Sequence, residues 1–306
     1  MQHKLQELIE SVSHVLYGKD LQIQQAITCL ITGGHLLIED LPGMGKTTLA
    51  HALAKVLGLD YQRVQFTSDM LPADILGVSI FNANQSEFVF HKGPIFTQLL
   101  LADEINRTTP KTQSALLEAM EERQVTIESV TYALPDPFFV IATQNPISQY
   151  GTFPLPESQL DRFLMRIQLG YPSEAAEREL LTGGDVRQKI SSLKPCVSLE
   201  DLSQIRLQCS EVKVSYSVLD YLQRIVRYTR ESDGFEYGIS PRGSLALLNT
   251  AKAWAYLHNR EFVLPDDIQM LLEPVIAHRL RAATVNGGEG ENPSIRKILT
   301  EVDVIG

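Results

Sequence analysis

The stretch Pro42-Gly43-Met44-Gly45-Lys46-Thr47-Thr48 constrains this chain more than any other part of its sequence. A short apolar run over residues 35–39 precedes it, and residues 47–57 follow with apolar side chains at helical spacing. A buried strand, a glycine-rich turn and a helix in this order direct backbone amides and a helix N-terminus toward one point. The pattern therefore predicts a phosphate site, in which Lys46 reaches the β- and γ-phosphates and the Thr47 hydroxyl binds Mg²⁺.

The turn departs from its usual form at Asp40, where the pattern normally begins with glycine. Aspartate tolerates unusual backbone angles better than most residues, so we interpret the turn as a variant. An accidental glycine-rich turn is the alternative, and the strand before it and the helix after it argue against that reading. The residues predicted to bind the nucleotide here are Pro42, Gly43, Met44, Gly45, Lys46, Thr47 and Thr48.

A second apolar run, residues 99–102, ends in the adjacent carboxylates Asp103 and Glu104. At the end of a buried strand, one carboxylate can lie at a metal ion and the other near an attacking water. We expect Asp103 to hold Mg²⁺ through its water ligands and Glu104 to act as the general base. Two acids at a strand end are ordinary turn residues by themselves. Together with the phosphate turn, they predict ATP hydrolysis, with ATP and Mg²⁺ as the bound groups.

The order of these patterns predicts an α/β fold with a mostly parallel sheet. Residues 138–142 form a third apolar run, and a helix beginning at Thr109-Pro110 separates it from the second. Beyond about Gly170 the periodicity is almost entirely helical, with a start signal at Ser240-Pro241. The predicted divisions are a nucleotide-binding domain over residues 1–170, a helical domain over residues 171–306 and, within the latter, a loop over residues 286–292.

Composition argues against several other classes of protein. With 44% hydrophobic and 21% charged residues, the chain is typical of globular proteins. No apolar run approaches the roughly 18 residues that span a bilayer, and residues 1–17 resemble an amphipathic helix more than a signal peptide. We therefore expect no membrane insertion and a cytoplasmic location. The net charge of −10 argues against nucleic acid as the main partner, and Cys29, Cys196 and Cys209 lack metal-ligand spacing.

Several motifs in combination resemble the MoxR family of AAA+ ATPases. They are Asp103-Glu104-Ile105-Asn106-Arg107, PKTQSALLEAMEE at residues 110–122, ATQNP at residues 142–146 and PLPESQLDRF at residues 154–163. The similarity runs from about Gly18 into the helical half of the chain. It implies an AAA+ fold, in which a three-layer αβα core with a mostly parallel sheet is followed by a smaller helical lid domain.

The resemblance also implies roles for single residues. Asn145 matches the sensor-1 position, whose side-chain amide helps to orient the attacking water. Arg162 matches the arginine finger that reaches a neighbouring subunit's site, with Arg166 as a lesser candidate; a surface salt bridge to Asp161 or Glu157 is the alternative for Arg162. Arg242 matches sensor 2, and whether it acts in its own subunit or in the next stays open. Gly18 matches the segment that lies against adenine.

Two further segments resemble inserts of the same group of ATPases. Residues 81–93 match the helix-two insert, and residues 124–132 match the hairpin before sensor 1. In related ring ATPases such hairpins face the central pore. Sheet-edge ribbons that pack on the core are an equal alternative, so contact with a client protein stays open.

The function implied by the resemblance is that of a ring-forming, chaperone-like remodeller. Such a protein forms a homo-oligomeric, hexameric ring, hydrolyses ATP and matures protein complexes or inserts metal cofactors, often with a von Willebrand factor A domain partner and a client protein. The alternatives are a magnesium-chelatase-like ATPase subunit, a DNA-translocating AAA+ motor, and a nucleotide-gated binding module without turnover. A small-molecule kinase fits least, because it has no use for Arg162 and Arg242.

Overall fold

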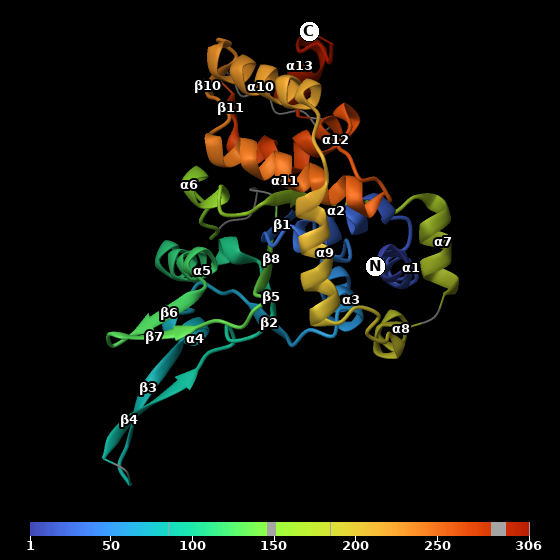
Figure 1. The fold of residues 1–306 in the computed structure, drawn as a ribbon. Coiled ribbons are helices and arrows are strands. Elements are labelled where there is room, and N and C mark those ends of the chain that lie inside the picture. The colour runs from blue at the N-terminus through green and yellow to red at the C-terminus, as the bar shows by residue number, and fades with distance from the viewer. Residues whose placement is uncertain (85, 146–150, 184, 283–291, 306) are drawn as a thin grey trace.

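The computed structural model describes residues 1–84, 86–145, 151–183, 185–282 and 292–305. At its centre is a sheet of five parallel strands in the order β2-β5-β8-β1-β9 (Figure 1). The strands are β1 (Leu36–Glu39), β2 (Tyr61–Gln65), β5 (Leu99–Asp103), β8 (Phe139–Gln144) and β9 (Met165–Ile167). The three apolar runs of the sequence are β1, β5 and β8, so the predicted α/β class with a parallel sheet is confirmed.

Alternate side chains of the strands pack into two hydrophobic layers. Leu36 and Ile38 of β1 pack with α1, α2 and α3, whereas Leu37 packs with α5 on the opposite face. Figure 1 shows α5 on one side of the sheet and α1 and α3 on the other. The arrangement confirms the three-layer αβα core. The helices of this half are α1 (Gln2–Ser13), α2 (Asp20–Ile31), α3 (Lys46–Val56), α4 (Pro72–Leu76), α5 (Pro110–Glu122), α6 (Glu157–Leu160) and the 3₁₀ turn η1 (Ile105–Arg107).

The rest of the chain is mainly helical, as the periodicity predicts. Its elements are α7 (Glu174–Thr182), α8 (Val186–Ser192), α9 (Leu199–Glu211), α10 (Tyr216–Glu231), β10 (Phe235–Tyr237), α11 (Pro241–Leu257), α12 (Pro265–Ile276), the 3₁₀ turn η2 (Ala277–Arg279), β11 (Arg281–Ala282) and α13 (Pro293–Glu301). Helix α11 begins at the predicted signal, where Ser240 Oγ accepts the Gly243 N–H at 3.1 Å.

One hydrophobic cluster runs from Leu5 to Val302, so the helical half packs directly on the αβα layers. The predicted boundary at residue 170 stays a prediction. The loop predicted over residues 286–292 lies, apart from Asn292, outside the described residues. Within the described ranges, no helix has both the length and the apolar character needed to cross a membrane.

Two antiparallel hairpins extend from the core on the side of α4 and α5 (Figure 1). They are β3 (Gly77–Asn82) with β4 (Glu87–Lys92), and β6 (Gln124–Ile127) with β7 (Val130–Ala133). The Phe90 and Tyr132 rings stack at 4.3 Å and join the two hairpins. Phe81 and Phe88 stay 54% and 65% exposed, so apolar surface remains on the longer hairpin.

Two buried histidines are held in the neutral form. His35 Nδ1 accepts the Val140 N–H at 3.0 Å, so its Nε2 carries the proton and donates to the Met120 carbonyl at 3.2 Å. His278 Nε2 contacts the Phe163 carbonyl at 2.9 Å. Burial lowers the pKa of His35 to about 4 and the pKa of His278 to about 3.

The free energy of unfolding is therefore expected to fall on acidification. Because both pKa values are lowered on folding, the unfolded chain takes up protons first as the pH drops below 6.5. The loss is on the order of 1.4 kcal/mol per pH unit for each histidine between about pH 6 and pH 4. Urea unfolding at pH 7, 6 and 5 measures it. A His35→Asn variant should show a shallower slope, whereas the exposed His91→Asn should not; an unchanged slope in both would contradict the assignment.

Candidate nucleotide-binding site

The carboxyl ends of β1, β5 and β8 meet at one edge of the sheet and border a cavity of about 340 Å³. Ligands of parallel α/β sheets bind at this edge because the turns and acids that follow the strands gather there. The predicted site residues that line the cavity are Pro42, Gly43, Gly45, Lys46, Thr47, Thr48, Asp103, Glu104 and Asn145. The fold thus brings together residues that lie up to 103 positions apart in the sequence.

The loop after β1 leaves room for an anion. Gly43 and Gly45 have φ values of +87° and +96°, a region that favours glycine. A Cβ on Gly43 would meet nothing within 4 Å, whereas one on Gly45 would lie 2.7 Å from Leu16 Cδ1. Helix α3 begins at Lys46, so its first backbone N–H groups lack helical partners at the loop. Together with the helix dipole, they form a cradle for phosphate.

Lys46 is the buried cation of the cavity, with 7% exposure. Its ammonium donates to the carbonyls of Asp40 and Leu41 and, at 3.1 Å, to Asn145 Oδ1. Burial lowers the pKa of Lys46, and the nearby carboxylates of Asp40, Asp103 and Glu104 oppose that shift. A positive group held in this way can pair with phosphate oxygens at little cost in side-chain ordering.

The two acids at the end of β5 share one hydrogen-bond network. Thr143 Oγ donates to Asp103 Oδ1 at 2.6 Å and accepts the Glu104 N–H at 2.9 Å. Asn145 Nδ2 donates to Glu104 Oε1 at 3.0 Å, and Arg107 pairs with Glu104 Oε2 at 2.8 Å. Glu104 adopts a left-handed conformation with φ of +57°, which only a few per cent of non-glycine residues do. Asn145 thus contacts both the buried ammonium and the carboxylate predicted to be the base.

The oxygen donors of the cavity suit Mg²⁺. The Thr47 hydroxyl and the Asp103 carboxylate line the same space, and both are hard ligands. Among the described residues, no group of three or more His, Cys, Asp or Glu side chains gathers to hold a metal ion. Magnesium in nucleotide sites commonly takes one or two protein oxygens and completes its shell with phosphate and water. The residues present therefore fit a magnesium–nucleotide complex.

Arg63 and Gln65 also line the cavity, and neither was predicted from the sequence. Arg63 donates to Asp103 Oδ2 from Nη2 at 2.7 Å and from Nε at 3.2 Å. The contact depends on the pairing of β2 with β5, in which Gln65 lies opposite Asp103. A polar residue in a short strand does not reveal that register. Arg63 holds the Asp103 carboxylate on the side opposite Thr143.

The explanation proposed for Asp40 is wrong. Asp40 is not among the described residues with positive φ, so it does not replace glycine for the sake of backbone freedom. Its side chain is instead a buried acceptor: Oδ2 receives the Leu169 N–H at 2.7 Å and the Gly170 N–H at 2.6 Å, and Oδ1 receives the Leu41 N–H at 2.8 Å. The carboxylate ties the phosphate loop to the segment that follows β9.

Two predicted nucleotide contacts lie outside this lining. Met44 is partly buried and packs against the large hydrophobic cluster. Gly18 has a φ of +65° in the turn between α1 and α2, where an added Cβ would lie 2.8 Å from Ala176 Cβ. The next residue, Lys19, donates to the Tyr171 carbonyl at 2.7 Å. The adenine contact of Gly18 stays a prediction.

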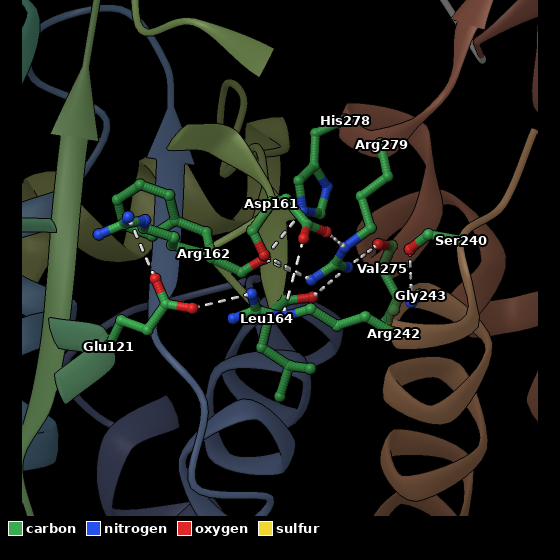
Figure 2. Close-up of polar contacts among 11 residues, drawn as sticks. Glu121, Asp161, Arg162, Leu164, Ser240, Arg242, Gly243, Val275, His278 and Arg279 are labelled. Atoms are coloured by element: carbon green, nitrogen blue, oxygen red, sulfur yellow. Dashed lines mark hydrogen bonds and ion pairs between the residues drawn. The ribbon is translucent and has the colours of Figure 1, made fainter. Parts of the chain in front are cut away.

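Arg162 and Arg242 line a different cavity, of about 280 Å³, which shares none of its lining with the first. Arg162 Nη2 pairs with Glu121 at 3.1 Å, not with Asp161 or Glu157, the partners considered from the sequence. Arg242 also pairs with Glu121, at 3.2 Å (Figure 2). In this structure the two arginines therefore share Glu121 as a partner, and neither lines the phosphate cavity of its own chain.

Comparison with known proteins places the chain in a family. Residues 35–165 match the ATPase family associated with various cellular activities (AAA), and residues 227–301 match the AAA lid domain. Chaperone MoxR1 of Mycobacterium tuberculosis is 38% identical over 287 residues, which cover 91% of this chain and 76% of the relative. The chain belongs to the MoxR family of AAA+ ATPases. YeaC, an uncharacterised protein of Bacillus subtilis, is 45% identical over 98% of this chain and 94% of its own length.

The crystal structure of a protein from Cytophaga hutchinsonii, described as a "putative ATPase", supports the same fold. It superposes with a TM-score of 0.86 at 39% identity, over 99% of this chain and 95% of that one. Membership of the MoxR family accounts for the AAA core with its lid, and it implies nucleotide binding. The sequence resemblance is therefore confirmed at the level of the family and of its fold.

Proposed function

We propose that this MoxR-family chain hydrolyses ATP to ADP and phosphate at sites shared by neighbouring subunits of a hexameric ring. The observation that carries the proposal is the separation of two half-sites. One cavity holds Lys46, Asp103 and Glu104, whereas Arg162 and Arg242 line the other. Phosphoryl transfer needs positive charge on the transferring group from more than one side, and a single subunit gathers only part of it.

The chemistry at the first cavity follows from its contacts. Lys46 and the N-terminus of α3 hold the β- and γ-phosphates, while bound Mg²⁺ would neutralise part of their charge from Thr47 and Asp103. Glu104 takes a proton from the attacking water as the water oxygen bonds to the γ-phosphorus. The bond from that phosphorus to the bridging oxygen breaks, and ADP leaves. Asn145 orients the water through its contact with Glu104.

The second cavity would supply further positive charge for the transition state of this reaction. A neighbouring subunit's Arg162 and Arg242 would reach the γ-phosphate and stabilise the charge that develops on it. Because Arg242 lies in the first turn of α11, its contact also couples nucleotide state to the lid helices. We propose that this coupling remodels a client protein, with the two exposed hairpins as client contacts. A partner with a von Willebrand factor A domain fits the family resemblance.

Turnover per subunit is expected to rise with protein concentration, and Arg162→Ala is expected to lower kcat by roughly 10³-fold with ATP affinity nearly unchanged. Steady-state phosphate release over a dilution series, with the oligomeric state measured in parallel, checks both. Arg166→Ala is the comparison variant: Arg166, the lesser candidate for the finger, pairs with Glu39 at 3.2 Å on the neighbouring strand, so its loss should leave kcat nearly unchanged. ATP hydrolysis at the full rate by a monomeric preparation, together with an active Arg162→Ala variant, would contradict the proposal that neighbouring subunits share the site.

A further inference from the structure

We propose that the Glu121 carboxylate holds Arg162 and Arg242 in the free subunit, at the position where these arginines would bind a phosphate group. In a subunit without a neighbour its carboxylate pairs both arginines, and on assembly the γ-phosphate of the adjacent subunit's nucleotide displaces it. The inference rests on the proposed function and adds a regulatory contact to it. The contact of the two arginines with the neighbouring nucleotide then competes with their ion pairs to Glu121 inside the same subunit. Those ion pairs therefore oppose both ring assembly and ATP hydrolysis.

The contacts of Glu121 are those of a bridging anion. Its Oε2 pairs with Arg162 Nη2 at 3.1 Å, and its Oε1 accepts from Arg242 Nη1 at 3.2 Å. Figure 2 shows the carboxylate between the two guanidinium groups. Each oxygen takes one arginine, as oxygens of a phosphate would. Arg242 has one further carboxylate contact, to Asp161 at 3.7 Å.

The nearby Arg279, in contrast, has the contacts expected of an arginine with a purely structural role. Arg279 is 5% exposed, and its guanidinium donates to Asp161 and to the carbonyls of Phe163, Leu164 and Val275. These contacts hold η2, which carries Arg279, against the segment that precedes β9. The side chains of Arg162 and Arg242 are 28% and 55% exposed and have carboxylates as partners in the described structure. Partly exposed ion pairs are weak and exchange easily.

The charge of the second cavity also favours an incoming anion. Its lining includes the guanidinium groups of Arg123, Arg162, Arg242 and Arg279 and the carboxylates of Glu121 and Asp161. Positive groups are therefore in excess, and the excess grows when Glu121 turns away. A phosphate group carries more charge than one carboxylate and would meet the arginines in an interface with less water.

The place of Glu121 in the fold joins three elements. It lies in the last turn of α5, Arg162 follows α6, and Arg242 lies in the first turn of α11. Just after α5, Arg123 adopts a left-handed turn that leads into the hairpin β6–β7. Displacement of Glu121 therefore frees the lid helix α11 from the helix that carries this hairpin.

Glu121→Gln tests the inference, because it keeps the size of the side chain and removes its charge. We expect the subunit concentration for half-maximal assembly and for half-maximal ATP hydrolysis to fall about fivefold, since two weak ion pairs no longer oppose assembly. The oligomeric state at each concentration, measured in ATP, gives a readout apart from turnover. Glu122→Gln, an exposed neighbour on the same helix end, should change neither quantity.

The arginine variants separate this inference from the proposed function. In a chain with both Arg162→Ala and Arg242→Ala, Glu121→Gln should cause no further shift in assembly, because no arginine remains to pair with it. Unchanged or weaker assembly of the Glu121→Gln single variant would overturn the inference alone. If turnover per subunit of the wild-type chain did not depend on protein concentration, the proposal of a shared site would instead be overturned.

Discussion

Lys46→Ala is expected to weaken ATP binding by roughly 10- to 100-fold, the loss typical of a charge-assisted contact to phosphate. The Lys46 ammonium is buried in the phosphate cavity at the N-terminus of α3. The other cation of the lining, Arg63, is exposed and pairs with Asp103, so it does not replace Lys46. Titration with a fluorescent ATP analogue or calorimetry measures the change. At a protein concentration high enough for full assembly, the rate of ATP hydrolysis should fall with the fraction of sites that hold ATP.

The same substitution also removes a donor from the loop. The Asp40 and Leu41 carbonyls lose their partner, so part of any effect can come from a looser turn. Lys55→Ala, an exposed position in the last turn of the same helix, is the control for charge alone. Urea unfolding of both variants separates stability from binding. An unchanged affinity for ATP in a folded Lys46→Ala chain would show that the phosphates bind elsewhere.

Glu104→Gln is expected to keep ATP affinity within about threefold and to lower kcat by roughly 10²- to 10⁴-fold. Glutamine fills the same space and still accepts from Asn145 Nδ2, but it cannot take the proton of the attacking water. Binding and phosphate release, measured on one preparation, give the two numbers. Normal hydrolysis by this variant would exclude Glu104 as the base.

A control for Glu104→Gln is Glu118→Gln, which removes the same charge from an exposed position of α5. It should leave both quantities unchanged. Held in ATP, the Glu104→Gln chain is also a bait for partners. Affinity capture that recovers a protein with a von Willebrand factor A domain together with an enzyme would support the remodelling function.

The site could be predicted from the sequence where its residues follow strands. The turn after β1, the acids that end β5 and the Asn after β8 each follow an apolar run, and parallel strands bring such ends to one edge. Local rules also gave the start of α11 at Ser240-Pro241. For these residues a short stretch of sequence indicates both the chemical role of the side chain and its place at the edge of the sheet.

The contacts that the sequence did not show depend on register or on tertiary packing. Arg63 meets Asp103 because β2 lies beside β5, and Asp40 binds the amides after β9. Glu121 meets Arg242 across 121 positions, where α5 and α11 approach each other. Such charged residues look like ordinary surface groups in a single sequence, since neither their spacing nor their neighbours indicate the partner.

The most direct test of the shared site is a mixture of two inactive chains. Glu104→Gln lacks the base but keeps Arg162, and Arg162→Ala lacks the finger but keeps Glu104. In mixed rings some interfaces pair an intact base with an intact finger, so an equal mixture should recover up to about a quarter of the wild-type rate of phosphate release. Recovery of phosphate release on mixing is expected if neighbouring subunits share the site. A mixture that assembles into rings and stays as inactive as its components would contradict it.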